Sequence, residues 1–329
     1  MLAFRDAQRL SFITILFIVL CIPSAAAASV PQDVKDASLG YSHYAMGLIH
    51  EYYGEFEESL EEYKKAAESD RQSALIHKRL GITYTKLNNA EEAIKELKLS
   101  SELDPKDTES RFLLALLYSS QKQYDKATQE YRSILEEASE ENPENTQIHF
   151  HLGQLYYQEK EYDLAIGEFK LIFGLDPENK EALFMLGSLY LEKKEIDVAI
   201  ETFKQVLKLD PGFPPALNSL GYVYVEEDML LDEAITLINQ ALEAEPNNGA
   251  YVDSLGWAYF KKGMIEEAIE KLEAASQLLQ DPVIYDHLGD AHLTTGNTVK
   301  AHESWQRSLE IKEDDIILKK LKSLKKGTK

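Results

Sequence analysis

The sequence predicts an all-α protein built as one solenoid of stacked helix–turn–helix units. The stretch from Leu183 to Pro211 has the length of two short helices joined by a turn, with small, aromatic and proline residues at regular positions. The same arrangement returns along nearly the whole chain of 329 residues, so one repeated array is expected rather than separate globular domains. The positions that recur are, in this stretch, Leu186, Gly187, Tyr190, Ala199, Phe203 and Pro211.

Each residue type suits its place in such a unit. Two antiparallel helices approach closely only where side chains are small, and Gly187 and Ala199 provide that contact. Tyr190 and Phe203 fill the space around it from helix faces at spacings of three and four residues. Pro211 stops the second helix because it has no amide hydrogen and a rigid ring. One such hairpin cannot bury its apolar face alone, so neighbouring units must stack.

The pattern Leu-Gly-x2-Tyr, then Ala-x3-Phe, then Pro resembles the tetratricopeptide repeat, a unit of about 34 residues. The resemblance implies a right-handed superhelical solenoid of eight repeats over 40–313, with a basic capping helix and tail at 314–329. Repeat three has four extra residues near Glu136–Asn142, and repeat six has one near Asp228–Leu231. After a linker at 29–39, the expected repeats are 40–73, 74–107, 108–145, 146–179, 180–213, 214–248, 249–281 and 282–313.

Composition excludes several classes of function. The net charge of −22 argues against nucleic-acid binding, because phosphates require a basic surface. Solubility of an elongated array explains this acidity, which also favours basic partners. The single cysteine, Cys21, permits neither a disulfide framework nor a cysteine-based metal site. No nucleotide loop, nucleophile elbow or metalloprotease helix occurs, so the sequence predicts no enzyme, no catalytic residue, no metal and no cofactor.

Residues 1–28 have the composition of an export segment. Arg5 and Arg9 precede the apolar run Leu10–Ile22, and Ala25–Ala28 offers small residues for cleavage. A cleaved signal peptide is the leading interpretation, while an uncleaved membrane anchor and a lipoprotein remain open. On each of them the positive-inside rule sends the repeats outward, to the periplasm or the extracytoplasmic face of a bacterial membrane.

A finer resemblance concerns the segment Leu217–Ala275. It is similar to the C-terminal repeats of exported bacterial tetratricopeptide proteins, and Asp253–Trp257 (DSLGW) is its most specific part. Some members of that group are outer-membrane adaptors for periplasmic proteases and envelope machinery. The resemblance therefore implies an envelope scaffold. Cys21 departs from the lipidated members, because Leu20 stands where a lipobox has a small residue.

The family also indicates where partners would bind. In it the first helix of each repeat lines the concave face, and positions counted from each glycine select an aromatic set and a polar set. Aromatic side chains suit an extended peptide or an amphipathic helix, although packing against the neighbouring repeat explains them equally well. Polar side chains suit a cation-bearing peptide, although a solvated face explains those too. The candidate groove residues are Tyr44, Tyr52, Phe112, Phe150, Tyr157, Phe184, Asn218, Tyr222, Asp253, Trp257, Phe260, Asp286 and Asp290.

Two further groups have competing interpretations. His43, His77 and His149 occupy a position where the repeat normally has an aromatic packing residue, so packing is favoured over metal binding. The same preference holds for the histidines of repeat eight. The lysines of residues 319–326 suit a capping helix with a basic outer face, and also a contact with an anionic lipid surface.

These observations predict a non-enzymatic adaptor whose groove binds peptides or helices of envelope proteins, such as a protease or an assembly machine. The membrane would be touched only through the N-terminal segment, if that segment is uncleaved. A membrane-tethered structural factor of a secretion, pilus or polysaccharide-export machine is the alternative. A third possibility is an activator that docks a periplasmic hydrolase.

Overall fold

The computed structural model describes residues 32–327, and within that range the regular structure is entirely helical. The predicted export segment, residues 1–28, lies outside the described residues. The all-α class is confirmed. The helices are α2 (Gln32–Tyr53), α3 (Phe56–Ser69), α4 (Ala74–Lys86), α5 (Ala90–Leu103), α6 (Thr108–Ser120), α7 (Tyr124–Glu141), α8 (Thr146–Gln158), α9 (Tyr162–Leu175), α10 (Lys180–Glu192), α11 (Ile196–Leu209), α12 (Pro214–Glu226), α13 (Leu231–Ala244), α14 (Gly249–Lys261), α15 (Ile265–Leu278), α16 (Pro282–Thr294), α17 (Thr298–Ile311) and α18 (Asp315–Gly327).

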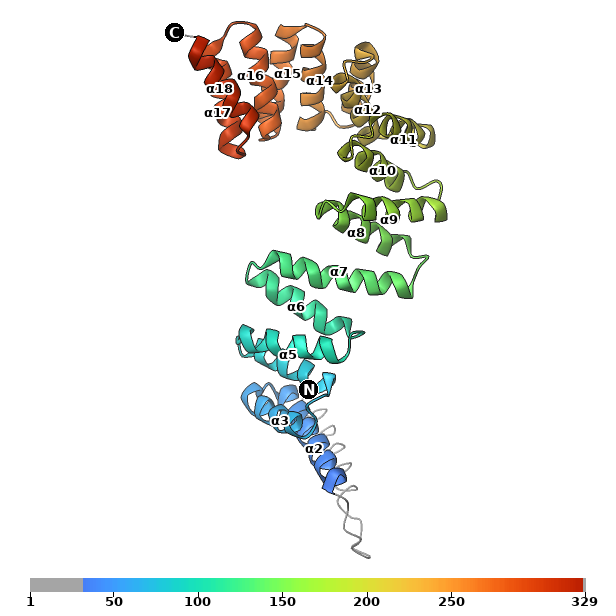
Figure 1. Cartoon of the computed structure of the whole chain (residues 1–329), viewed down its shortest axis with the longest axis vertical. Coiled ribbons are helices and arrows are strands. Elements are labelled where there is room, and N and C mark those ends of the chain that lie inside the picture. Colours follow the sequence, from blue (N-terminus) through green and yellow to red (C-terminus); the bar gives the residue numbers. More distant parts are fainter. Residues whose placement is uncertain (1–31, 328–329) are drawn as a thin grey trace, which may run out of the picture. The chain divides into compact units, whose positions relative to one another are not determined.

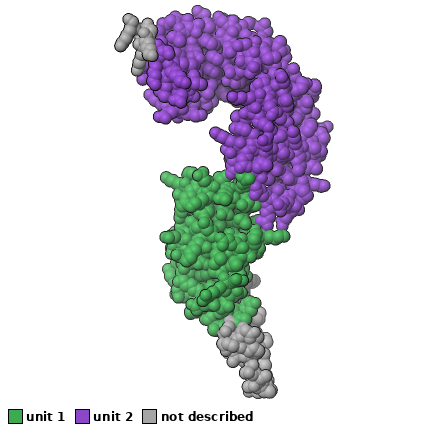
Figure 2. Space-filling view, viewed as in Figure 1, with its two compact units in different colours: residues 1–134 green, residues 135–329 purple. Residues whose placement is uncertain are grey.

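The helices form two compact units, coloured separately in Figure 2. Unit 1 runs to Ile134 and contains α2–α6 with the start of α7, and unit 2 runs from Leu135 and contains the helices from α8 to α18. In both units consecutive helices pair as antiparallel hairpins, as Figure 1 shows for α8 with α9 and α16 with α17. These consecutive pairs are the arrangement expected of a tetratricopeptide solenoid.

A glycine in the first helix of a pair makes room for one large side chain of the second. A Cβ atom on Gly187 would lie 2.6 Å from the Phe203 ring, and one on Gly81 would lie 2.5 Å from the Leu97 side chain. Phe203 and Leu97 are fully buried. The glycine of the first helix therefore makes room for a bulky residue that lies four positions after the small residue of the second helix. In repeat five the small residue is Ala199 and the bulky residue is Phe203.

The turn inside each pair contains a residue in the left-handed backbone region. Glycine fills this place at Gly54, Gly263 and Gly296, where it adopts positive φ without steric strain. Other repeats use residues with a side chain, for example Lys194 with φ of 61°. The turn between α12 and α13 has one more residue than its neighbours, and Leu230 there takes φ of 45° as well.

One helix begins earlier than expected, and another carries the extra helical turn that the four additional residues predicted. Helix α2 begins at Gln32, so residues 32–39, predicted as part of a linker, are helical. Because neither proline nor glycine occurs between Gln32 and Gly40, nothing in that stretch stops the helix from extending backwards. The four extra residues of repeat three lengthen α7 to 18 residues, against 14 in α5, and so add about one helical turn rather than a loop.

The largest core lies in unit 2. Its apolar side chains run from Leu135 to Ala258 and include the fully buried rings of Phe169 and Phe203. A smaller cluster closes the C-terminal end, where Ile317 and Leu321 of α18 pack against Trp305 of α17. Burial of large side chains at every helix pair gives the stacked hairpins their stability.

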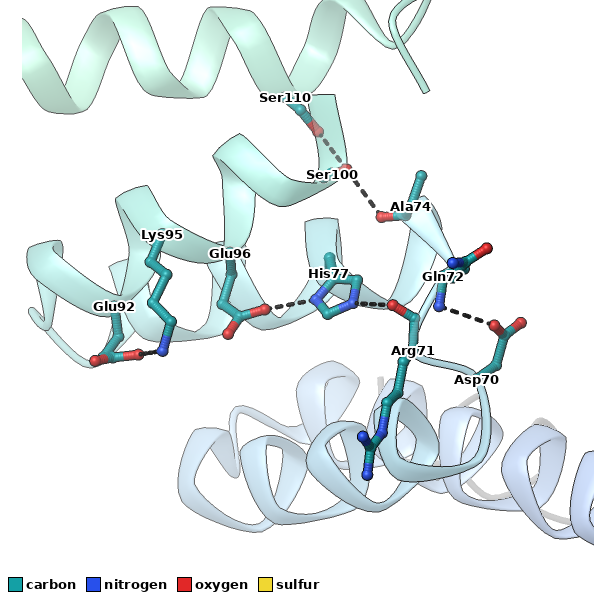
Figure 3. Close-up of polar contacts among 10 residues, drawn as sticks. All are labelled: Asp70, Arg71, Gln72, Ala74, His77, Glu92, Lys95, Glu96, Ser100 and Ser110. Atoms are coloured by element: carbon teal, nitrogen blue, oxygen red, sulfur yellow. Dashed lines mark hydrogen bonds and ion pairs between the residues drawn. The ribbon is translucent and has the colours of Figure 1, made fainter. Parts of the chain in front are cut away.

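Buried histidine–glutamate bridges join first and second helices in several repeats. His77 Nδ1 lies 2.6 Å from Glu96 Oε2 and its Nε2 lies 3.1 Å from the Arg71 carbonyl oxygen (Figure 3). A backbone carbonyl and an ionised carboxylate both accept hydrogen bonds, so this arrangement favours the charged imidazole, in which both ring nitrogens donate. The hydrogen bond that His77 donates to Glu96 raises the pKa of His77, and burial opposes that rise.

The bridge recurs with the same sequence separation of 19 residues. His43 pairs with Glu62 and His149 with Glu168, each at 2.6 Å, and His149 also repeats the contact with a backbone carbonyl, that of Pro143. His77 and His149 are buried, as the packing interpretation expects. Sequence analysis did not identify their glutamate partners.

Candidate functional site

Trp257, on α14, is the centre of the predicted groove residues in unit 2. Helix α14 begins after Asn248, whose side chain accepts hydrogen bonds from the Ala250 and Tyr251 amides, and this cap sets the helix register. The Trp257 Nε1 donates to Glu226 Oε1 at 2.6 Å, across to α12. An indole with this partner is held in one orientation.

The Trp257 ring is also stacked. Its centroid lies 4.7 Å from that of Phe260 with an interplanar angle of 7°, and 4.0 Å from that of His287 with an angle of 9°. The first contact is within α14 and the second reaches α16. Trp257 thus links three successive first helices, α12, α14 and α16, and contacts with the chain itself occupy much of its ring.

Asp253 is buried, with 6% of its surface exposed. It accepts a hydrogen bond from His287 Nδ1, whose distance to Oδ1 is 3.0 Å, so it joins α14 to α16. Tyr222 lies on α12 beside this pair. Burial, followed by the charges of Glu226 and Asp253, raises the pKa of Tyr222, so the phenol stays neutral. Asn218, one turn earlier, has a buried Oδ1 with no hydrogen-bond partner among the described residues.

Asp286 and Asp290 hold a lysine of the chain itself. Lys320 Nζ of α18 donates to Asp286 Oδ1 at 2.7 Å and to Asp290 Oδ2 at 2.8 Å, and it lies 5.7 Å from the centroid of the Trp305 ring. Burial raises the pKa of Asp290 while Lys320 opposes that rise. These carboxylates were expected to suit a cation-bearing peptide, and a cation from α18 occupies them.

These residues lie on three successive first helices, α12, α14 and α16, and are called here the C-terminal cluster. It combines aromatic rings, carboxylates and amide or imidazole groups from the first helices of three repeats. Its members are Asn218, Tyr222, Glu226, Asp253, Trp257, Phe260, Asp286, His287 and Asp290.

Two of the other candidates of unit 2 contact rings of their own repeats, and the third contacts the next repeat. The Phe150 ring meets Phe169 edge-on with centroids 5.4 Å apart, and Phe184 lies 5.7 Å from Phe203. Such contacts fit the packing alternative for these two residues. The Tyr157 hydroxyl donates to Glu192 Oε1 at 3.2 Å. A role in binding stays a prediction for all three.

The candidates of unit 1 differ in exposure. Tyr52 is 82% exposed and Phe112 is 52% exposed, so both offer apolar surface to a partner. Tyr44 is half-buried, and its ring packs on that of Tyr63 with centroids 5.7 Å apart. Tyr44 and Tyr52 lie on α2 and Phe112 lies on α6, and the three make no ring contact with one another among the described residues.

The histidines of repeat eight have separate partners. His287 bonds to Asp253, while His292 is buried with its Nε2 3.9 Å from Glu273, and burial lowers the pKa of His292. Among the described residues no group of three or more His, Cys, Asp or Glu side chains is placed to hold a metal ion. Nor is any helix in residues 32–327 both long and apolar enough to cross a bilayer.

Sequence analysis missed Glu226, His287 and Lys320 as members or partners of the cluster. A usable signal was present, because residues one repeat period apart lie side by side on neighbouring first helices. Asp253 and His287 are 34 residues apart, as are Asp286 and Lys320. A search for complementary polar residues at that separation finds both pairs.

Stacked helix pairs joined by contacts between successive first helices define a helical-repeat protein. Comparison with protein families identifies which helical-repeat family the chain matches. Models of the tetratricopeptide repeat match residues 53–117, 158–220 and 190–257, and a second such model matches 112–177. The chain belongs to the tetratricopeptide repeat family. The recognition made from the sequence motifs is therefore confirmed.

Solved structures show the same fold. A tetratricopeptide repeat protein from Parabacteroides merdae is 18% identical with a TM-score of 0.57, over 77% of this chain and 98% of that one. The APC/C hetero-tetramer Cut9–Hcn1 contains a chain that is 19% identical with a TM-score of 0.56, over 82% of this chain and 52% of that one. A comparison with curated proteins finds no match. Membership of this family implies a scaffold for protein–protein interaction.

Proposed function

We propose that the protein is an exported, non-enzymatic adaptor that binds peptides or helices of bacterial envelope proteins at the C-terminal cluster. The observation that carries the proposal is the Trp257 arrangement, in which one indole joins α12, α14 and α16 through Glu226 and His287. A rigid aromatic group costs little conformational entropy when a partner binds, so it suits recognition. Family membership supports the scaffold role, and the composition of residues 1–28 supports export.

The experiment is site-specific photocrosslinking in a bacterial host. A benzophenone-bearing phenylalanine replaces Tyr222, which is half-buried on α12 within the cluster. The control carries the same group at Val198, 44% exposed on α11, the second helix of repeat five. A discrete envelope protein captured at Tyr222 but not at Val198 is expected. Capture at both positions alike, or at neither, would remove the cluster from the proposal.

Export is tested separately by sequencing the N-terminus of the mature protein. We expect it to begin near Ser29, after the four alanines, because small residues there suit signal peptidase. A mature chain that retains residues 1–28 would contradict cleavage and favour the membrane-tethered structural factor. In that case crosslinking at the C-terminal cluster still decides whether partners bind there.

A further inference from the structure

The last helix, α18, is attached to repeat eight through one apolar edge and one lysine. Ile317 and Leu321 are its buried apolar side chains, and they pack on Trp305. Lys320 supplies the polar contact by donating to Asp286 and Asp290, which lie one turn apart on α16. The attachment therefore combines apolar burial with a charge-assisted pair at one end of the C-terminal cluster.

Several features limit the strength of this attachment. Ile316 of α18 is 63% exposed, and a hollow remains between α16, α17 and α18 beside Leu293 and Trp305. Lys319 and Lys322 have no acidic partner among the described contacts, so lysines on neighbouring turns repel one another. A helix of 13 residues is also marginally stable without its docking site.

Release of α18 would uncover a specific surface. Trp305 is 1% exposed between α16, where its Nε1 lies against Gly289, and α18, where Ile317 and Leu321 cover it, so release of α18 would uncover only the part of the ring that this helix covers. Beside it, Asp286 and Asp290 would lose their cation, which leaves two carboxylates one turn apart at partly buried positions. Two negatively charged carboxylates at partly buried positions repel each other and are poorly solvated when no cation lies between them, so their charged forms are unfavourable there. The uncovered surface therefore has an apolar half and an anionic half.

We propose that α18 is an exchangeable occupant of this surface, and that the partner is an amphipathic helix that carries a lysine at the position of Lys320. The proposal rests on the proposed function, since it names the chemistry of the partner for one end of the same cluster. The proposal is based on the contacts that α18 makes with Trp305, Asp286 and Asp290. An apolar edge beside a lysine matches Trp305 and the two carboxylates, and a partner with those features gains the same contacts.

The test uses the full chain and a fluorescent synthetic peptide of residues 313–327, EDDIILKKLKSLKKG. Lys320→Ala should release α18, seen as faster amide hydrogen exchange in that helix. Lys322→Ala, on the same helix but without an acidic partner among the described contacts, should leave the exchange rate unchanged. The peptide should bind Lys320→Ala about tenfold or more tightly than the parent, because the parent offers the surface only when α18 is released.

Two further measurements isolate the carboxylates. The double variant Asp286→Asn with Asp290→Asn should release α18 but bind the peptide no better than the parent. A peptide in which the Lys320 position is alanine should bind the Lys320→Ala chain more weakly than the natural peptide. Unchanged exchange in Lys320→Ala, or equal binding of both peptides by every variant, would overturn the proposal. Neither result bears on crosslinking at Tyr222, so the two proposals fail separately.

Discussion

The packing of Gly187 against Phe203 predicts opposite effects for two glycine substitutions in unit 2. In Gly187→Ala the new Cβ would lie 2.6 Å and 2.8 Å from two atoms of the Phe203 ring. That ring is fully buried and cannot move aside, so overpacking should cost about 1–3 kcal/mol. Gly167, within α9, has no atom within 4 Å of an added Cβ. There alanine should stabilise the helix by about 1 kcal/mol through its propensity alone.

The propensity gain is common to both substitutions, so their difference isolates the overpacking. Gly187→Ala should be less stable than Gly167→Ala by about 1–3 kcal/mol. Long repeat arrays need not unfold in one step, so native-state hydrogen exchange of the α10–α11 and α8–α9 pairs is the appropriate assay. Equal changes in the two variants would refute the reasoning, because they would show that Phe203 does not fill the space at Gly187.

Two other predictions follow from the turns and the bridges. Leu230→Gly should stabilise the α12–α13 pair by about 1 kcal/mol, because Leu230 takes φ of 45°, a backbone conformation that glycine adopts without strain. Leu230 is 55% exposed, so its removal loses little packing. Hydrogen exchange of this pair measures the change, and a loss of stability would contradict the prediction. His77 has a raised pKa, so its charged bridge with Glu96 contributes stability fully below the unfolded-state pKa of about 6.5, and that stability is lost as pH rises through the folded-state pKa. The free energy of unfolding of the α4–α5 pair should therefore fall as pH rises through the folded-state pKa of His77. The variant His77→Gln should lose this pH dependence. If the variant keeps the same pH profile, the bridge is not the cause of the pH dependence.

The sequence was sufficient for the repeat because its key residues are set by packing geometry. Gly187, Phe203 and Ala199 are needed wherever two helices meet in this way, and each is buried as expected. The start of α2 was harder to predict, since a polar stretch such as 32–39 is compatible with both a linker and a helix. Helix ends are set by local competition among weak effects, and periodicity does not resolve them.

The candidate site was predicted less completely. Sequence positions placed Trp257, Asp253 and Asp290 on first helices, where the structure has them. Their partners were not identified, because a side chain's hydrogen bond depends on which rotamer the neighbouring repeat permits. Trp257 illustrates the consequence. It was a candidate for partner binding, with packing against the neighbouring repeat as the alternative, and the structure shows such packing: Glu226 accepts from its nitrogen, and the rings of Phe260 and His287 stack on it.

The polar pair between the two helices of a repeat is not kept along the whole chain. In early repeats a basic residue four positions before the small residue of the first helix pairs with a glutamate of the second, as in His77–Glu96 and Arg111–Glu130. At the matching position repeats five to seven have Leu183, Leu217 and Val252, and all three are buried.

Polar contacts that run from one repeat to the next occur in both units, as in Arg79–Glu51 and Lys78–Glu109 of unit 1 and in Asp253–His287 and Asp286–Lys320 of unit 2. Bridges inside a repeat stabilise that repeat whether or not its neighbour is in place. Contacts between repeats are lost when a neighbour moves. Because Lys320 of α18 is held by such a contact, movement of α18 would break its pairs with Asp286 and Asp290, which is the step that our proposal for α18 requires.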